Sequence, residues 1–528
     1  MIGRPSMAHS LSQQEEKDTK TSITEVKSPV LTTVLSLEGE LIEINEKDAD
    51  QAFQYALDTI NLELDPDVER KLIRKIDWMI LPIVVALMSC QLMDKTTNSY
   101  ASIMGLQSDL KMTGQVYSWV GSSFYFGYLV FEFPANLLLQ RFPLSKTLGT
   151  AVIIWGIILM CHAACFSSAP FLLCRVLLGV FEGFMNPAYI LLTSQWYKKS
   201  EQFMRSCIWF GFQGFGTILG AGIAYALAKY DNYALASWRL LYVITGSITI
   251  FLGILSIVHV PDIPVKAWFL NETEKKYCVE RIRGNQQGFG NQRFKKNQVI
   301  EAFTDLRTLL FFIYGMSYAI PNGGFTNFGS ILLKGDFGFS TYEALLMNMP
   351  GGGIDIVIPF LVAWLSLKFF KGDRLIICFI VNTLVIVGMC LLNFTNNKGS
   401  KLTGYLTFYA ATAVVSGMVS CISSNTAGHT KKVTVNTLFL VGYCVGNIIG
   451  PQSFRANQAP NYAGAKIAML VSFCAGDVCI ALMYWLNKRD NKIRDAKREA
   501  LGSEYTPAEN VEFSDLTDKE NPEFRYSL

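Results

Sequence analysis

One apolar run sets the length scale of this chain: Trp78-Met-Ile-Leu-Pro-Ile-Val-Val-Ala-Leu-Met-Ser-Cys-Gln-Leu-Met-Asp-Lys-Thr-Thr97. A helix of about 20 residues is roughly 30 Å long, which matches the hydrocarbon core of a lipid bilayer. The run holds no charged residue before Asp94 and Lys95, close to its end. It therefore predicts a membrane-spanning helix that carries two charges inside the membrane.

Eleven further runs of similar character follow, and a long polar and basic break divides all twelve into two sets of six. The first set is 78–97, 116–139, 147–166, 170–193, 207–229 and 239–259, and the second is 305–325, 340–367, 373–394, 402–424, 433–454 and 466–487. We predict an all-α membrane protein with twelve transmembrane helices in two pseudo-symmetric six-helix halves. The expected domains are a disordered cytosolic tail (1–70), a first bundle (71–259), a cytosolic linker (260–304), a second bundle (305–487) and a cytosolic C-terminal tail (488–528).

Composition agrees with this interpretation. The 528 residues are 51% hydrophobic and 17% charged, whereas about 25% of residues are charged in soluble proteins. The formal net charge of +3 gives no reason to expect a nucleic acid partner. Lys and Arg are far more frequent on alternate loops, those that face the cytosol if both termini are cytosolic. The 12 cysteines follow no disulfide or zinc spacing, so we expect them to be reduced.

Charged side chains inside the membrane are the first candidates for function, because each costs about 2.5–3.5 kcal/mol to insert. The first half holds Asp94, Lys95, Glu132, Arg175 and Glu182, whereas the second half has few. This asymmetry predicts that ion coupling takes place mainly in the first half.

Arg175 and Glu182 are seven residues apart, so they share one face of a helix with Gly179 between them. A small residue there admits a neighbouring backbone or a ligand. Two interpretations stay open: a structural Arg–Glu lock, or a coupling device in which a substrate anion competes for the cation and the carboxylate exchanges a proton.

The other candidates are mainly neutral polar residues. Tyr125, Tyr128 and Glu132 form a stripe on the second predicted helix, for which packing and transport roles both remain open. In the second half amides replace most charges. The remaining candidates there are Asn322, Asn327, Asn348, Asp355, Asn425 and His429, the last as a cytosolic gate contact.

Several stretches together resemble the anion:cation symporter family of the major facilitator superfamily, in particular its fungal allantoate permease branch. They are Arg74-Lys-Ile-Asp77, Met93-Asp-Lys95, Glu132-Phe-Pro-Ala-Asn136, the segment 175–187, Ser424-Asn-Thr-Ala-Gly-His-Thr-Lys-Lys432 and Asp515-Leu-Thr-Asp-Lys-Glu-Asn-Pro-Glu-Phe-Arg-Tyr526. The resemblance covers the chain from about residue 70 to its C-terminal tail. It implies the major facilitator fold and proton-driven uptake of a small organic anion.

The resemblance also implies roles for particular residues. Asp94 and Glu182 match the proton-coupling carboxylates, while Lys95 and Arg175 match the cations that hold the substrate's acidic group. Tyr128 and Asn425 match residues of the substrate pocket. Lys95 stands where Arg is common in the family, and lysine lacks the planar fork that clamps a carboxylate at two points.

These observations predict a proton symporter for a small organic anion, working by alternating access. The alternative from another class is a nutrient sensor that retains the transporter fold without carrying a substrate. No nucleotide, zinc or hydrolase motif occurs, so we expect neither an enzyme, nor a cofactor, nor a metal. We further expect a monomer in the plasma membrane, or alternatively in the endoplasmic reticulum or another endomembrane. Its tails would bind trafficking or ubiquitination machinery.

Overall fold

The computed structural model describes residues 32–35, 41–44, 66–230, 232–283, 295–370, 372–501, 516–521 and 524–528. Near the N-terminus, β1 (Thr32–Leu35) pairs antiparallel with β2 (Leu41–Ile44). Strands rich in Thr, Val and Ile suit a pleated sheet. The rest of 1–65 lies outside the described residues, so the expected disorder there stays a prediction.

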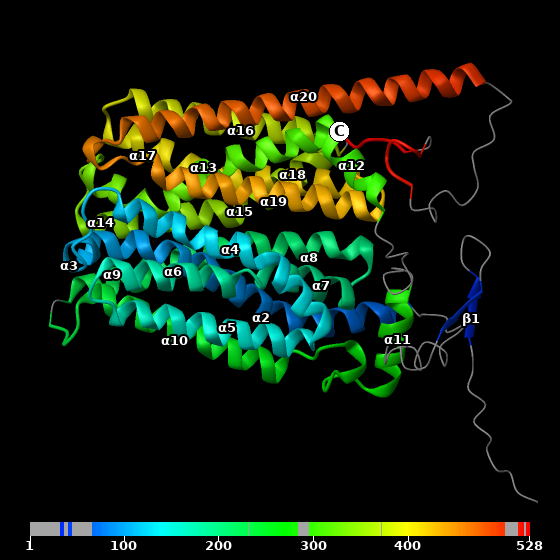
Figure 1. The fold of residues 1–528 in the computed structure, drawn as a ribbon, viewed down its shortest axis with the longest axis horizontal. Coiled ribbons are helices and arrows are strands. Elements are labelled where there is room, and N and C mark those ends of the chain that lie inside the picture. Colours follow the sequence, from blue (N-terminus) through cyan, green and yellow to red (C-terminus); the bar gives the residue numbers. More distant parts are fainter. Residues whose placement is uncertain are drawn as a thin grey trace, which may run out of the picture. The chain divides into compact units, whose positions relative to one another are not determined.

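Helices make up the rest of the described chain apart from its loops (Figure 1). The first half contains α2 (Pro66–Ala101), the π-helix Ser102–Leu106, α3 (Gln107–Asp109), α4 (Val116–Arg141), α5 (Leu144–Cys161), α6 (Ser168–Glu182), α7 (Met185–Trp196), α8 (Lys199–Gly211), α9 (Gln213–Lys229) and α10 (Ser237–His259). The linker contributes α11 (Glu272–Arg283) and α12 (Lys296–Thr304). The second half contains α13 (Leu306–Gly335), α14 (Thr341–Leu346), α15 (Met349–Phe369), α16 (Arg374–Phe394), α17 (Lys398–Thr407), α18 (Ala411–Asn425), α19 (His429–Gln452) and α20 (Ala463–Leu501).

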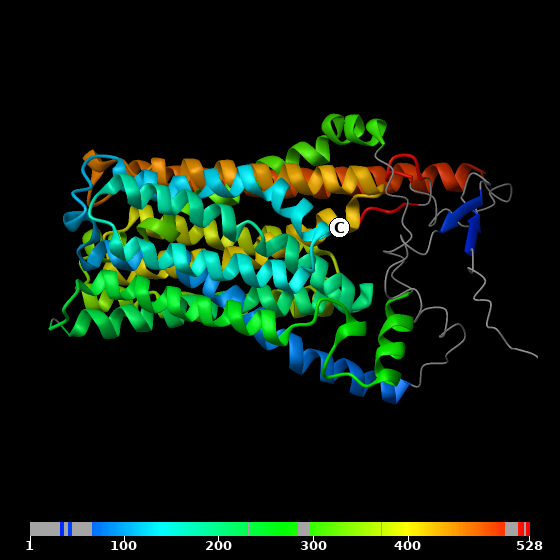
Figure 2. The same cartoon turned by 60° about the horizontal axis from the view of Figure 1, so that its bottom comes forward.

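The helices pair in the same order in both halves. In the first half α2 packs on α9, α4 on α6, and α5 on α10. Their counterparts in the second half pair likewise, α13 on α19, α15 on α18, and α16 on α20 (Figures 1 and 2). The halves meet where α4 packs on α19, α9 on α15, and α2 on α13. This repeated pairing confirms the prediction of two pseudo-symmetric halves.

Ten helices in the described residues are long and apolar enough to cross a membrane. The two predicted runs outside that set are α4 and α13, helices of 26 and 30 residues. Both are rich in Tyr, Ser, Gly and Asn, which lowers their hydropathy. Since α4 and α13 lie where the halves meet, their polar residues contact other helices instead of lipid.

Some predicted single helices are pairs. The run 170–193 is divided into α6, which ends at Glu182, and α7, which begins at Met185. Pro187 has no backbone N–H for the carbonyl four residues earlier, that of Gly183, so a regular helix stops there. In contrast, α13 continues through Gly323 and Gly324, although glycine is a poor helix former.

Glycines on α4 and α6 allow these two helices to touch. A Cβ atom placed on Gly179 would lie 2.0 Å from the carbonyl oxygen of Phe124, and one on Gly127 would lie 2.0 Å from that of Val176. Gly179 therefore admits the backbone of α4. This contact holds α6 at a fixed depth against α4 and brings the charged residues of α6 towards α2.

Contacts between the halves cluster at the predicted outer end. Tyr117 donates to the carbonyl of Asn327 at 2.8 Å, and Ser122 donates to the carbonyl of Ile448 at 2.7 Å. Ser118 donates to the carbonyl of Phe454 at 3.2 Å. These bonds join α4 to α13 and to the end of α19, so the two halves are closed together there.

Ion pairs at the opposite, predicted cytosolic end join elements of the first half to each other and to the linker. Lys75 of α2 pairs with Glu274 of α11 at 2.7 Å, and Arg205 of α8 pairs with Asp77 of α2 at 2.9 Å. Arg281 of α11 contacts Glu69 at 2.9 Å. The first part of the linker is thus attached to the first half.

Candidate transport site

A buried ion pair links α2 and α6. The Lys95 ammonium lies 2.7 Å from Glu182, whose side chain is fully buried, while 18% of the Lys95 side chain is exposed. Glu182 thus pairs with a lysine on another helix, and not with Arg175 of its own helix. The Arg–Glu lock considered from the sequence is absent among the ion pairs of the described residues.

Arg175 and Lys95 lie at similar distances from one aromatic ring, that of Phe124. The ring centre of Phe124 is 5.6 Å from the Lys95 ammonium and 5.7 Å from the Arg175 guanidinium. Arg175 also donates from Nε to the carbonyl of Val120 at 3.4 Å. The negative face of an aromatic ring attracts cations, so Phe124 holds two positive charges near each other within the bundle.

Asn98 of α2 lies between Arg175 and Tyr242 of α10. A guanidinium can only donate, so the amide oxygen of Asn98 faces Arg175 and accepts from its Nε at 3.0 Å. The amide nitrogen then donates to the Tyr242 hydroxyl. Asn98 therefore fixes the direction in which the guanidinium points.

Asp94 is fully buried one residue before Lys95. Its Oδ2 accepts from the hydroxyl of Thr249 on α10 at 3.1 Å. Its Oδ1 has no hydrogen-bond partner among the described residues. A buried carboxyl oxygen without a donor is costly when charged, and this makes Asp94 a candidate proton carrier.

A small cavity of about 10 Å³ lies between the halves, lined by Lys95, Phe124, Tyr125, Arg175 and Asn327 among others. A volume of ~10–15 Å³ holds a single water molecule. The cavity therefore marks where two cations face the second half, in a conformation too closed for an organic substrate.

The second half presents neutral hydrogen-bonding groups. Asn322 of α13 donates to the hydroxyl of Tyr443 at 3.2 Å and to the side-chain oxygen of Asn447 at 3.0 Å. The Tyr443 ring meets that of Tyr125 edge to face, 6.2 Å between centres. Since Tyr125 lines the small cavity, this amide and phenol cluster continues the site into the second half.

Tyr128 and Glu132 follow Tyr125 along α4. The Tyr128 hydroxyl accepts from Asn186 at 2.9 Å, and its side chain is buried. Glu132 is half-buried. This stripe therefore runs from the charged centre towards the predicted cytosolic end.

Other candidates lie apart from the charged centre. Asn348 donates to Ala344 and accepts from Tyr405, both at 2.7 Å, in a local network. Asn425 exchanges hydrogen bonds with Ser527 of the C-terminal tail.

Asp355 is buried on α15, and one of its oxygens has no partner within the described part of the chain. A Cβ on Gly214 of α9 would lie 2.9 Å from the Cβ of Asp355, so this carboxyl lies where the halves meet. The side chain of His429 lies outside the described residues, and its proposed gate contact stays a prediction.

Three carboxylates at the predicted cytosolic end, those of Glu301, Asp305 and Asp518, could in principle bind a metal ion. The ammonium of Lys431 is instead 2.9, 2.8 and 2.7 Å from them, respectively. Burial alone would raise the pKa of Asp305, but the charge of Lys431 outweighs it and holds that pKa below its ordinary value. The cluster therefore binds a lysine of the same chain.

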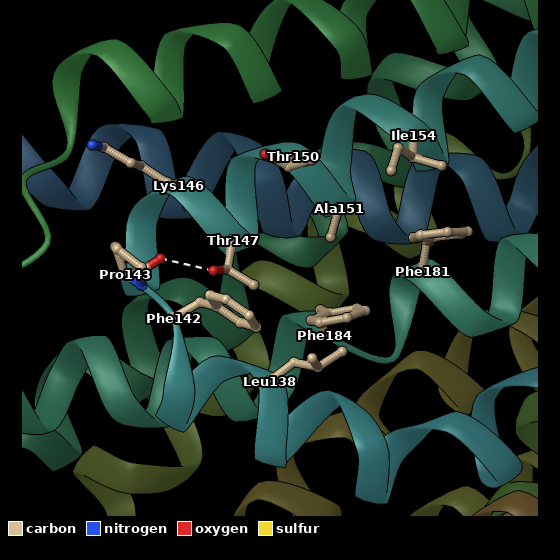
Figure 3. A pocket seen from close by; sticks show the side chains of 10 residues that line it. All are labelled: Leu138, Phe142, Pro143, Lys146, Thr147, Thr150, Ala151, Ile154, Phe181 and Phe184. Atoms are coloured by element: carbon tan, nitrogen blue, oxygen red, sulfur yellow. Dashed lines mark hydrogen bonds between the residues drawn. The ribbon is translucent and has the colours of Figure 1, made fainter.

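A second cavity, about 360 Å³, lies elsewhere in the first half (Figure 3). The rings of Phe142, Phe181 and Phe184 gather around it, and Thr147 donates to the carbonyl of Pro143 at its edge. Its lining is largely apolar, with Lys146 as its charged residue. It therefore lacks the groups needed to bind a polar substrate.

Sequence reasoning did not select Asn98, Thr249 or Tyr443. Asn98 is three residues after Lys95 on one helix face, so its position was a usable signal. Thr249 and Tyr443 lie on helices whose rotation towards the centre becomes known only from the packing.

Twelve predicted membrane runs in two matching halves, with buried charges where the halves meet, define a membrane transporter. Residues 83–451 match the model of the Major Facilitator Superfamily. The chain belongs to this superfamily, which confirms the family expected from its motifs.

Its relatives include fungal transporters. It is 44% identical to the allantoate permease of Saccharomyces cerevisiae over 95% of this chain and 94% of that protein. It is 46% identical to an uncharacterized transporter of Schizosaccharomyces pombe over 93% of this chain and 96% of that protein. A solved bacterial homolog of the human lysosomal transporter Spinster, inward-facing and occupied, has the same fold, with a TM-score of 0.58 and 15% identity over 78% of this chain and 96% of that one.

Proposed function

We propose that this protein is a proton-coupled symporter that brings a small organic anion into the cell by alternating access. The observation that carries the proposal is the buried Lys95–Glu182 pair beside Arg175. Isolated charges at this depth are costly. Lys95 and Arg175 are two cations, and Glu182 is the carboxylate paired with Lys95. Positive charge therefore remains available to bind an anion.

The proposed binding step is an exchange of partners. A substrate carboxylate reaches the cavity between Lys95 and Arg175 and replaces Glu182 at the Lys95 ammonium. Glu182 is then a fully buried carboxylate that has lost its cation, and such a group is more stable when it has bound a proton. One anion and at least one proton therefore occupy the site together.

Asp94 is the second proposed proton carrier, because one of its oxygens lacks a partner among the described residues and the other accepts only from Thr249. Tyr128 and Glu132 extend from the centre along α4. We assign them to the proton's exit towards the cytosol.

The rest of the substrate would face the second half. The hydroxyl of Tyr443 and the oxygen of Asn322 offer a donor and an acceptor, which complement an amide or urea group. Allantoate is a carboxylate with two ureido groups, and a relative 44% identical is named as its permease. Allantoate is therefore the first substrate to test.

The test is uptake of labelled allantoate by the purified chain in liposomes. With the outside at pH 5.5 and the inside at pH 7.5, we expect accumulation that disappears when both sides are at pH 7.5. Lys95→Met abolishes uptake, while Lys111→Met, which removes an exposed loop lysine, leaves it unchanged.

Competition by unlabelled carboxylates and by uncharged allantoin measures the demand for an anion. Equal accumulation without a pH gradient would refute proton coupling. Competition by allantoin as strong as that by allantoate would refute recognition of the carboxylate.

The accompanying proposals are a plasma-membrane location, both termini in the cytosol, and a monomeric protein. The distribution of Lys and Arg supports the orientation of the termini. Accessibility of tags at the two ends in intact and permeabilised cells tests it.

A further inference from the structure

The C-terminal tail contacts the second half at its predicted cytosolic end. Its described residues, 516–521 and 524–528, lie near the inner ends of α13, α18 and α20 (the red segment beside the C label in Figure 1). Tyr526 is 3% and Asp518 1% exposed. Burial of this degree is unusual for a terminal segment that only passes over a surface.

Asp518 anchors the first part of the tail. Its Oδ1 lies 2.7 Å from the Lys431 ammonium and accepts from the backbone N–H of Ala427 at 3.4 Å. Its Oδ2 accepts from the Tyr526 hydroxyl at 2.8 Å. Ala427 and Lys431 flank Gly428, whose φ of +84° turns the chain from α18 into α19. Asp518 therefore binds both sides of a turn between two membrane helices.

Arg494 of α20 binds the tail backbone. Its guanidinium donates to the carbonyls of Asp518 at 2.6 Å, Asn521 at 3.1 Å and Phe524 at 2.5 Å. Three carbonyls bound by one guanidinium fix the curvature of the segment, because the donors of arginine have a rigid planar geometry.

The Tyr526 ring contacts two guanidinium groups. The Tyr526 ring centre is 3.7 Å from the guanidinium carbon of Arg307 on α13 and 5.0 Å from the guanidinium carbon of Arg494. Burial, followed by the charge of Asp518, raises the pKa of Tyr526, so its hydroxyl remains a donor at physiological pH. The ring thereby joins α13 to α20.

Ser527 and Leu528 reach the remaining helices. The Ser527 N–H donates to the side-chain oxygen of Asn425 at 2.7 Å, and the Asn425 amide returns a bond to the Ser527 carbonyl at 3.0 Å. Asn487 of α20 donates to the same carbonyl at 3.1 Å. The Leu528 oxygen accepts from the N–H of Arg374, the first residue of α16, at 2.6 Å.

We propose that the tail residues 516–521 and 524–528 form a cytosolic clamp, in which the tail binds a polar groove made by the inner ends of α13, α16, α18, α19 and α20 and makes them move as one body. Alternating access requires each half to move largely as a rigid unit. The groove is lined by Asn425, Arg307, Lys431, Asn487 and Arg494, whose side chains bind the tail as a peptide ligand is bound. While the clamp is closed, Asn425 is engaged by the tail and does not act as a substrate ligand.

The test compares full-length variants in detergent by hydrogen exchange. Asp518→Ala and Tyr526→Ala remove the two central anchors, and Glu499→Ala, on an exposed part of α20, is the matched control. In the unaltered chain we expect the amides of Ala427, Tyr526 and Ser527 to be protected from exchange. In both clamp variants they exchange at least about tenfold faster, with a lower thermal midpoint, and the control retains full protection.

The clamp is overturned if the tail amides of the unaltered chain exchange like those of a free peptide, or if Asp518→Ala leaves the exchange at Ala427 unchanged. Uptake of labelled allantoate then tests the consequence for transport. We expect a several-fold lower maximal rate with little change in KM. An unchanged rate in a variant that has lost its protection refutes the requirement for the clamp, whereas the exchange measurements test the clamp itself without any substrate.

Discussion

Replacing Glu182 by Gln separates anion binding from proton coupling. The substitution keeps the size of the side chain and an oxygen that can face Lys95, but it removes the negative charge and the proton-binding group. If the anion and Glu182 compete for Lys95, the variant should bind the anion more tightly and yet fail to accumulate it. A purely structural ion pair predicts the opposite for binding, because its loss would distort the site.

The size of both effects follows from the geometry. The Lys95 ammonium and a Glu182 oxygen form a buried ion pair at 2.7 Å, and a contact to a charged group of this kind is worth about 1.5–3 kcal/mol. With a neutral amide in place of the carboxylate this attraction falls by on the order of 1 kcal/mol, so the anion meets that much less competition and binds roughly three- to tenfold more tightly. A gradient of about two pH units supplies about 2.7 kcal/mol per proton, or ~100-fold accumulation, and the variant loses this factor.

Two measurements on the same preparation decide between these interpretations. Equilibrium binding of labelled allantoate at pH 5.5 and 7.5 gives the affinity, and liposome uptake with and without a pH gradient gives the accumulation. Glu499→Gln, which alters an exposed carboxylate on α20 far from the pair in sequence, is the control. Weaker binding combined with full gradient-driven accumulation in Glu182→Gln would refute the partner exchange.

Two other predictions concern packing and acid stability. Gly179→Ala places a Cβ 2.0 Å from the carbonyl oxygen of Phe124 and should cost about 1–3 kcal/mol of stability, seen as a lower thermal midpoint. The control Gly353→Ala, whose Cβ meets nothing within 4 Å, should leave the midpoint unchanged. Equal midpoints for the two variants would contradict the close contact at Gly179. Lys431 holds the pKa of Asp305 in the folded protein below its ordinary value. The charged Asp305 therefore stabilises the fold at pH values above the pKa of the unfolded chain, about 3.9. This stabilisation is lost as the pH falls through the lower pKa of the folded state. Thermal midpoints measured from pH 7 to pH 3 should therefore decrease once the pH is below about 4, and the decrease should be less steep in Asp305→Asn. If the midpoints of both proteins decreased in parallel with pH, Asp305 would not be the group responsible.

The fold could be predicted from the sequence because insertion into a membrane constrains the composition of both helices and loops. Runs such as 78–97 must be apolar over the length that spans the bilayer. The Lys and Arg residues of the loops determine which side of the membrane each loop faces. What the runs do not specify is where a helix breaks within its length. The division between α6 and α7 depends on Pro187, whereas Gly323 leaves α13 continuous because α19 packs closely against it.

The site could be predicted in part. Lys95 and Glu182 were identified because charge inside a membrane is rare, but their pairing depends on how α2 and α6 are rotated about their axes. Asn425 shows the limit of a motif. Its polar character in a membrane helix is consistent with a substrate ligand or with a structural contact, and only the tail's position shows that Ser527 is its partner here.

In the proposed mechanism the two halves have different roles. The carboxylates proposed to exchange protons and the cations proposed to meet the anion all belong to the first half, where α2 and α6 hold Lys95 and Glu182 in contact. The second half offers neutral donors and acceptors at Asn322 and Tyr443. Changes in the second half can therefore alter which uncharged group is accepted without disturbing the exchange between proton and anion. On this basis, substitutions at Asn322 should shift the preference among carboxylates while leaving the dependence of accumulation on the pH gradient intact.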